Sequence, residues 1–352
     1  MATMDNDDTK ASAENRPGGD EVASLQKGYE KHLEKARADH GQKLDGQLKA
    51  LEKLSKKYEK DARKGADKAG LDVEAMRADF EAAGEGDPEG TLARFEKARA
   101  AWAPRLAKAV AATGADPTQG AAEARAVLGD DVPEDLPEAG TRDADRALSS
   151  QGLVGYSVDI ASWWVPPPPP PPPPPAVSTL TIPKPYTLGS TAGGASADRN
   201  TGRLSSYNSV IVGVQQHLAS VGGSFLADAA VRRIRVETVI DASYWTNLAA
   251  TWGYASAEVI LNLKVMDGAT VRGSQRLSLV RTIGAVFWIA GNSGSGAYTL
   301  ACEFAHAYGT PKTYAALVEL ETWAGGGGVL VVSPASASGT ATPRNVTVTL
   351  MR

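Results

Sequence analysis

The sequence predicts a multidomain α + β protein with an N-terminal helical or coiled region, a polyproline linker, and a C-terminal antiparallel β-sandwich or barrel-like closure. Three observations support this prediction. Charge is concentrated in residues 1–150, which hold 24 basic and 31 acidic residues, against 13 and 10 in the rest of the chain. Apolar residues recur at helical spacing in that first part and at every second position after residue 176. Ten consecutive prolines, Pro166–Pro175, separate the two patterns.

The same changes in composition divide the chain into four segments. Residues 1–20 are polar, with few apolar side chains to bury, and this predicts a disordered tail. Residues 21–150 form the charged helical region, and residues 151–175 form the linker with its proline run. Residues 176–352 form the antiparallel β-domain. We expect the β-domain to fold by itself, because a stiff linker lets few contacts cross it.

The helical region opens with a long charged segment, residues 21–69. Pairs such as Glu52 with Lys56 have the i,i+4 spacing of favourable helix ion pairs. An apolar stripe follows near-heptad spacing, but it is too thin to be buried in a large core, and this favours a helical hairpin or a modest bundle. The alternative is a homo-oligomer that associates through the stripe. Its residues are Leu44, Leu48, Leu51, Leu54 and Tyr58.

Glycine and proline set limits on the helices. Four glycines in the first segment each weaken a helix by about 1 kcal/mol relative to alanine; they are Gly28, Gly41, Gly46 and Gly65. A helix over residues 73–84 is expected to end at Gly84, where a glycine C-cap fits. The helix after it is expected to stop near Pro104, because proline disrupts a helix interior.

After the prolines the chain reads as short strands with turn signals between them. Residues 231–240 and 257–265 place apolar side chains at alternate positions, which is typical of half-buried strands. Glycine-rich stretches predict turns at residues 291–296, 309–312 and 325–328. Such a pattern is typical of an antiparallel sandwich.

Two stretches of the β-domain instead show apolar residues at helical spacing. In residues 209–223, Val210, Val214 and Leu218 recur every four positions before a Gly-Gly pair. Residues 241–252 begin with Asp241, which suits the start of one or two helical turns. We therefore expect short helices in both stretches.

Four aromatic residues within eleven positions are the best candidates for a binding site. A tryptophan or tyrosine ring offers a flat apolar face with a polar edge, which suits a surface glycan, a membrane or a protein receptor. The alternative is that these side chains cap an open end of the sandwich. The four residues are Tyr244, Trp245, Trp252 and Tyr254.

No catalytic or metal-binding pattern is evident. Cys302 and His306 lie about 13 Å apart if their segment is a strand, at ~3.3 Å per residue, which is too far for a nucleophile–base pair. We therefore expect both to be structural. The chain has one cysteine and four histidines, too few for a typical zinc site, and we expect no metal and no cofactor. The glycines of residues 291–296 lack the lysine of a phosphate loop.

The proline run has two interpretations. As polyproline II it spans about 31 Å, because each residue rises ~3.1 Å, and Pro166–Pro175 would then hold two bodies apart as a spacer. Proline runs are also ligands for aromatic-lined grooves of other proteins. We favour the spacer.

Composition excludes some functions and leaves others open. Neither part is basic enough to predict nucleic-acid binding. The polar start and the short apolar stretches predict a soluble chain with no signal peptide and no transmembrane helix, either cytoplasmic or part of an exported or assembled particle.

The favoured function is therefore that of a non-enzymatic structural or adhesive protein, a layout shared with fibre-like appendages. Its helices would serve as a base or assembly handle for a β-sandwich binding head. The alternative is a toxin or delivered effector whose β-domain engages a membrane or receptor. A hydrolytic enzyme is a third class, for which no acid–base constellation is visible.

Overall fold

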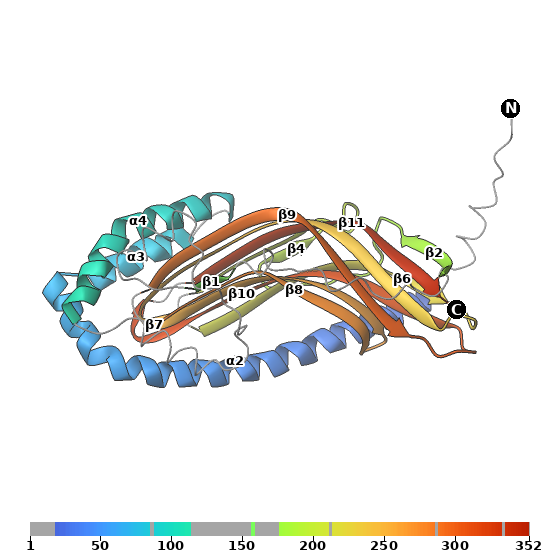
Figure 1. Ribbon diagram of the computed structural model, residues 1–352, viewed down its shortest axis with the longest axis horizontal. Coiled ribbons are helices and arrows are strands. Elements are labelled where there is room, and N and C mark those ends of the chain that lie inside the picture. Colours follow the sequence, from blue (N-terminus) through green and yellow to red (C-terminus); the bar gives the residue numbers. More distant parts are fainter. Residues whose placement is uncertain are drawn as a thin grey trace, which may run out of the picture.

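The computed structural model describes residues 18–84, 88–113, 156–158, 176–210, 213–285, 288–332 and 335–351. In this part of the chain the helices come first and all of the described strands follow them (Figure 1). The helices are α2 (Gly19–Ala69), α3 (Val73–Gly84) and α4 (Pro88–Thr113). The first 17 residues and the proline run lie outside the described residues, so the tail and the spacer stay predictions.

The strands range from two residues in β3 to 35 residues in β7. Their bounds are β1 (Tyr156–Val158), β2 (Ala176–Ile182), β3 (Thr191–Ala192), β4 (Ala195–Ala197), β5 (Leu204–Val210), β6 (Gly213–Ala227), β7 (Arg233–Asp267), β8 (Thr270–Ala285), β9 (Trp288–Ala305), β10 (Lys312–Val332) and β11 (Ala335–Met351).

The strands form two antiparallel sheets that pack as a sandwich, as the alternating pattern predicted. One sheet, here sheet A, contains β1, β3, β6, β8, β10 and the second half of β7. The other, sheet B, contains β2, β4, β5, β9, β11 and the first half of β7. Strand β7 therefore runs through both sheets. Apolar side chains between the sheets, including Val236, Leu300 and Val318, form the main core.

The two stretches expected to be helical are strands. Residues 213–223 belong to β6, and residues 241–252 belong to β7. In β6, Ala219 and Val221 face the main core, whereas Leu218 lies on the opposite face beneath α2. A strand that is buried on both faces loses the clean apolar–polar alternation. That loss explains why its apolar residues resembled a helical pattern.

Two of the three glycine-rich stretches are strand rather than turn. Residues 291–296 lie in β9 and residues 325–328 lie in β10, whereas residues 309–311 are the predicted loop before β10. Glycine makes room for a neighbour at these strand positions. A Cβ atom at Gly294 would lie 2.5 Å from the hydroxyl oxygen of Tyr244, the residue directly opposite on β7.

Residues 19–69 form one continuous helix, α2, rather than a hairpin. It ends at Gly70, a left-handed C-cap whose φ is 62°. Helix α3 ends at Gly84 as predicted. Helix α4 continues through Pro104 to Thr113, nine residues beyond the proline at which it was expected to stop. Trp102 before the proline and Leu106 after it are both buried in one apolar cluster, so packing on both sides of the proline stabilises the continuous helix.

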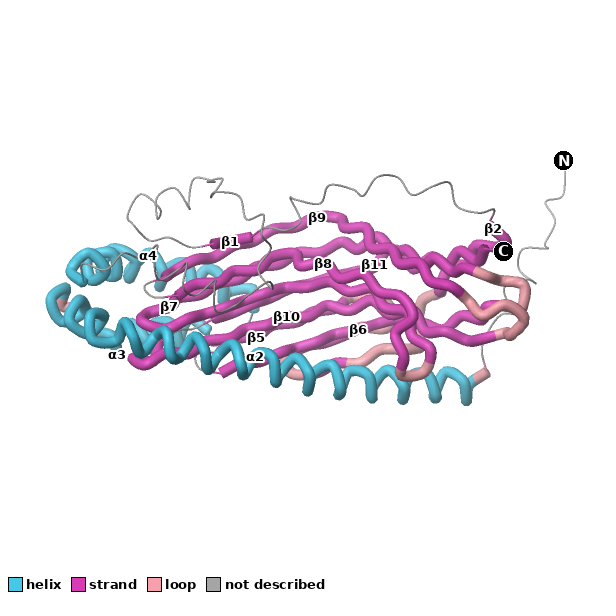
Figure 2. The backbone as a smooth tube through the Cα atoms, turned by 60° about the horizontal axis from the view of Figure 1, so that its bottom comes forward, coloured by secondary structure: helices cyan, strands magenta, loops and turns pink. Residues whose placement is uncertain are grey.

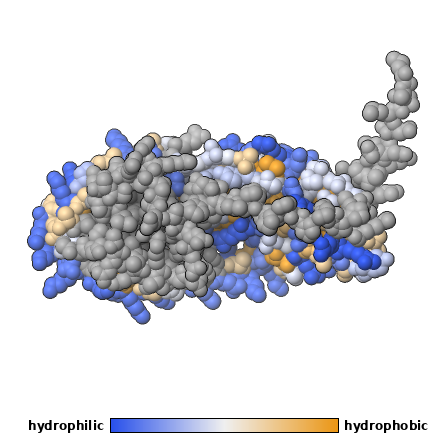
Figure 3. All heavy atoms as spheres, in the orientation of Figure 1, coloured by the Kyte–Doolittle hydropathy of each residue, from blue (hydrophilic) through white to orange (hydrophobic). Residues whose placement is uncertain are grey.

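The helices surround one end of the sandwich (Figure 1). The last turns of α2 pack with α3 and α4 around Phe80, Phe95 and Trp102, and hydrophilic residues border this end of the molecule (Figure 3). The first half of α2 runs along the strands of sheet A (Figure 2). Contacts therefore do join the helices to the sandwich, and independent folding of residues 176–352 stays a prediction.

None of the helices in the described part of the chain combines the length and apolar character needed to span a lipid bilayer.

Candidate functional site

The two described side chains of the predicted aromatic cluster, Tyr244 and Trp245, do not share one surface. Tyr244 and Trp245 are neighbours in β7, so their side chains point to opposite faces of the sheet. Tyr244 is 5% exposed in the main core, and its hydroxyl lies 3.4 Å from that of Tyr298. Trp252 and Tyr254 also lie in β7, but their side chains lie outside the described residues.

Trp245 faces the helices and packs against them. Its ring centroid lies 6.4 Å from that of Phe95 in α4 and 6.0 Å from that of Tyr207 in β5. The Tyr207 hydroxyl also donates a 2.9 Å hydrogen bond to the carbonyl of Gly84 at the end of α3. These contacts support the alternative stated above, in which an aromatic side chain seals the end of the sandwich. A ligand-binding role for Trp245 stays a prediction.

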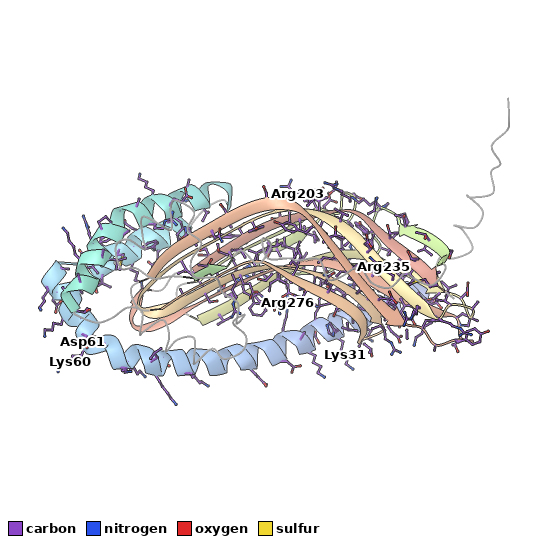
Figure 4. The ribbon with its side chains drawn as sticks, in the orientation of Figure 1. Lys31, Lys60, Asp61, Arg203, Arg235 and Arg276 are labelled. Carbon is purple, nitrogen blue, oxygen red and sulfur yellow. The ribbon has the colours of Figure 1, made fainter. Side chains whose placement is uncertain are left out.

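The sequence candidates for self-association all lie in α2. Leu54 is half-buried, and the side chains of Leu44, Leu48, Leu51 and Tyr58 lie outside the described residues. The outer side of this helix is charged, with Lys31, Lys60 and Asp61 exposed on it (Figure 4).

Cys302 and His306 have different neighbours within the β-domain. Cys302 is buried in the main core, and burial raises the pKa of its thiol to about 12. His306 follows the end of β9, and its Nδ1 lies 2.8 Å from the Tyr314 hydroxyl. Among the described residues, no group of three or more His, Cys, Asp and Glu side chains is arranged to hold a metal ion.

An exposed aromatic residue that the sequence analysis missed lies at the opposite end from α3 and α4. Tyr308 follows β9, and 68% of it is exposed. The guanidinium carbon of Arg232 lies 5.0 Å from the centre of its ring, a cation–π contact. In the sequence, Tyr308 continues the alternation of β9, so only the Gly-Thr-Pro that follows marks it as a loop residue.

The backbone fixes the two loops that carry this pair. The carbonyl of Arg232 accepts a 2.8 Å hydrogen bond from the amide of His306. The amide of Arg232 donates another, also 2.8 Å, to the carbonyl of Met351. The amide of Gly309 donates a third, also 2.8 Å, to the carbonyl of Ala229. The loop before β7 and the loop before β10 are thus tied to each other and to the end of β11. Tyr308 and Arg232 form the surface called the tip pair below.

A second unusual site lies beneath the first half of α2. Leu25, Tyr29 and Leu33 project from one face of this helix at spacings of four residues and are buried on sheet A. Beneath them lies an apolar strip of Leu188, Leu218, Met266, Ala315 and Leu317. Gln26 fixes the helix further, because its side-chain amide exchanges hydrogen bonds of 3.0 and 3.2 Å with the backbone of Gly189.

A buried polar cluster continues this strip. Glu319 in β10 is 0% exposed, and its Oε1 accepts a 2.8 Å hydrogen bond from the Tyr29 hydroxyl. Its Oε2 lies 2.8 Å from Nζ of Lys264 and 3.3 Å from Nδ2 of Asn262. Three donors therefore converge on one carboxylate. The three ionisable members, Tyr29, Glu319 and Lys264, are called the strap cluster below.

Burial governs the protonation of the strap cluster. It raises the pKa of Glu319, although the charge of Lys264 opposes the shift. It also raises the pKa of Tyr29, and the negative charge of Glu319 adds to that effect. For Lys264, burial disfavours the ammonium, but the charges of Glu319 and Glu321 outweigh it and raise the pKa. The geometry supports an ionised Glu319–Lys264 pair with a neutral Tyr29, because all three hydrogen-bond partners of the carboxylate are donors.

Comparison with known proteins gives little support to any family. No family model matches the chain, and no curated protein matches it. Among solved structures, the chain has a slight likeness to the carbohydrate-binding module TmCBM61 in complex with β-1,4-galactotriose. The two are 12% identical, the match covers 42% of this chain and 68% of that one, and the TM-score is 0.17. A likeness at this TM-score defines neither the fold nor the ligand of this chain.

Proposed function

We propose that the chain is a non-enzymatic binding protein whose helices serve as a base or assembly handle and whose β-sandwich is an elongated head. The observation that carries this proposal is the tip pair. Within the described residues, Tyr308 is the only exposed large apolar side chain. It belongs to the loop between β9 and β10, which lies at the far end of the sandwich from α3 and α4 (Figure 1). An exposed aromatic ring on a soluble surface is a common centre of recognition.

The chemistry of the tip pair suits a surface glycan. The tyrosine ring offers an apolar face for a sugar ring, while its hydroxyl and the Arg232 guanidinium offer hydrogen-bonding edges. Arg233 and Glu303 form an exposed ion pair of 3.2 Å nearby and add further polar groups. The loop hydrogen bonds hold these groups in place before binding, which lowers the entropy cost of recognition.

A glycan array probed with the full-length chain tests this proposal. Tyr308→Ala should weaken binding at least tenfold to the glycans that the parent chain binds, and Arg232→Ala should weaken this binding less. Thr299→Ala is the matched control, because this exposed residue lies in β9 away from the tip. All three variants should melt within a few degrees of the parent, since surface substitutions change stability by about 0.5 kcal/mol or less. Glycan binding that survives Tyr308→Ala would contradict the proposal. Failure of the parent chain to bind any glycan of the array would contradict it too.

A second candidate function, a delivered effector whose β-domain engages a membrane, is favoured by a different observation. Helix α2 covers an apolar strip on sheet A, so release of the helix would expose that strip. Leakage of dye from anionic lipid vesicles, measured with the full-length chain, separates the two functions. Leakage that Tyr308→Ala does not reduce would support the effector and not the glycan-binding head.

A further inference from the structure

The first part of α2 is held on the sandwich by contacts different from those described at the other end of the helix. The described contacts include Glu21, which accepts a 3.0 Å hydrogen bond from the Thr313 hydroxyl, and the buried Leu25, Tyr29 and Leu33. One turn further on, two guanidinium nitrogens of Arg37 are buried as well. Beyond them the helix extends toward α4, where its last turns join the separate cluster around Trp102. The docked half can therefore leave the sheet without breaking the packing at the other end.

We propose that residues 19–33 of α2 are a releasable cover of sheet A, locked by the strap cluster and opened when Tyr29 and Lys264 lose their protons. The occupant of this face of sheet A is thus a segment of the same chain. This proposal does not depend on glycan binding at the tip pair.

The geometry of the strap cluster makes its protons part of the lock. If Tyr29 loses its proton while docked, a phenolate faces the Glu319 carboxylate at 2.8 Å with no solvent between them. If Lys264 loses its proton, Glu319 is left as a buried charge without its counter-ion. Each loss leaves an uncompensated charge in a buried site, and lifting the helix relieves it by admitting water.

The direction of the pH dependence follows from the pKa shifts. The pKa values of Tyr29 and Lys264 are both raised in the docked state. Docking is therefore fully stabilised below the ordinary pKa values of these groups, 10.0 and 10.5, and is lost as the pH rises above them. Each linked proton changes the opening equilibrium by up to tenfold per pH unit. Two protons together give between tenfold and a hundredfold per unit.

Other charged groups lie around the cluster, and the histidine among them does not titrate in this alkaline range. His32 has a lowered pKa because of burial and the nearby lysines, so it is neutral above pH 9 whether docked or not. The charged groups near the cluster are His32 and Lys35 on α2, Glu321 on β10 and Arg276 on β8.

Thiol labelling in the full-length chain tests the proposal. Ala315 lies in the covered strip and is 0% exposed, so Ala315→Cys places a probe that reacts only when the helix lifts. Its labelling rate is divided by that of Ser274→Cys, an exposed reference on β8, which removes the common effect of pH on the thiolate. The native Cys302 reports any opening of the main core, and mass spectrometry distinguishes the two sites.

We expect the normalised rate to be constant between pH 8 and 9.5 and to rise tenfold to a hundredfold per unit above about pH 10.5. Cys302 should stay slow throughout. Tyr29→Phe keeps the ring but removes one linked proton, so it should lower that slope by about one power of ten per pH unit. A normalised rate independent of pH would overturn the proposal. So would parallel labelling of Cys302, or an unchanged slope in Tyr29→Phe.

Discussion

A pair of glycine substitutions in α2 separates the intrinsic cost of glycine from its role in docking. Gly28 lies where the helix backbone meets the turn between β7 and β8. A Cβ atom at this position would lie 2.4 Å from the carbonyl carbon of Gly268 and 2.8 Å from the amide nitrogen of Ala269. A Cβ atom at Gly46, in the same helix, would have no neighbour within 4 Å. Gly28→Ala and Gly46→Ala are thus identical changes in two different environments.

The expected difference follows from the packing. Both substitutions gain about 1 kcal/mol from the better helix propensity of alanine, so this contribution cancels between them. At Gly28 the neighbours are backbone atoms that cannot rotate away, and ordinary contact requires the helix to retreat by about 1 Å. Overpacking of this kind costs about 1–3 kcal/mol. Gly28→Ala should therefore be about 1–3 kcal/mol less stable than Gly46→Ala, and Gly46→Ala should be more stable than the parent.

Urea unfolding of the full-length chain, followed by circular dichroism, measures both free energies. The midpoints should separate while the slopes stay equal, because the same surface is exposed on unfolding. Gly65→Ala provides a second check, since its Cβ atom would lie 2.6 Å from the carbonyl oxygen of Ala109 in α4. Equal stabilisation by Gly28→Ala and Gly46→Ala would refute the docked position of α2.

Three further predictions concern other parts of the chain. Trp245→Ala should lower the unfolding free energy by about 2–3 kcal/mol, because it removes contacts with Phe95 and Tyr207. Thermal unfolding measures this change, and a loss below about 0.5 kcal/mol would show that the ring is dispensable for packing. Cys302 should resist thiol reagents at pH 7–8 in the native state, since its pKa is about 12; reaction at the rate of a free thiol would contradict its burial. Replacement of Pro166–Pro175 with a stiff helical linker of equal length should preserve binding if the run is a spacer, and a loss of binding would make the prolines themselves the ligand.

The sequence predicted element types well where an element has one buried face. Residues 231–240 have such a face: Ile234, Val236 and Ile240 point to the main core, while Arg233 and Arg235 point outward. Residues 73–84 likewise bury Met76 and Phe80 on one side of a helix that ends at its glycine. In both cases the local period of apolar residues is the period of the element. The prediction therefore needed no knowledge of distant neighbours.

Prediction failed where distant segments cover a second face. Leu218 looked like part of a helical stripe because α2, nearly 200 residues earlier in the sequence, buries the outer face of β6. The stretch around Gly294 resembled a turn because glycine is common in turns. The adjacent residues do not reveal that Tyr244, opposite it on β7, needs the space that a side chain would fill. The sequence shows which positions of α2 are glycine, but not which of them need to be. Gly28 allows the helix to contact the turn between β7 and β8, whereas Gly46 has no neighbour that requires a glycine.

Glu319 shows most directly why the strap cluster could not be predicted. It alternates with Val318 and Leu320 in β10, and a carboxylate at such a position ordinarily marks the solvent face of a strand. Here the same position is 0% exposed, because Tyr29 and its neighbours in α2 cover it and Lys264 supplies the counter-charge from β7. These partners lie 290 and 55 residues away in the sequence, and no local pattern links the three. A buried charge of this kind is stable only while every partner stays in place. Because those partners are distant in the sequence, the residues around Glu319 give no sign of it.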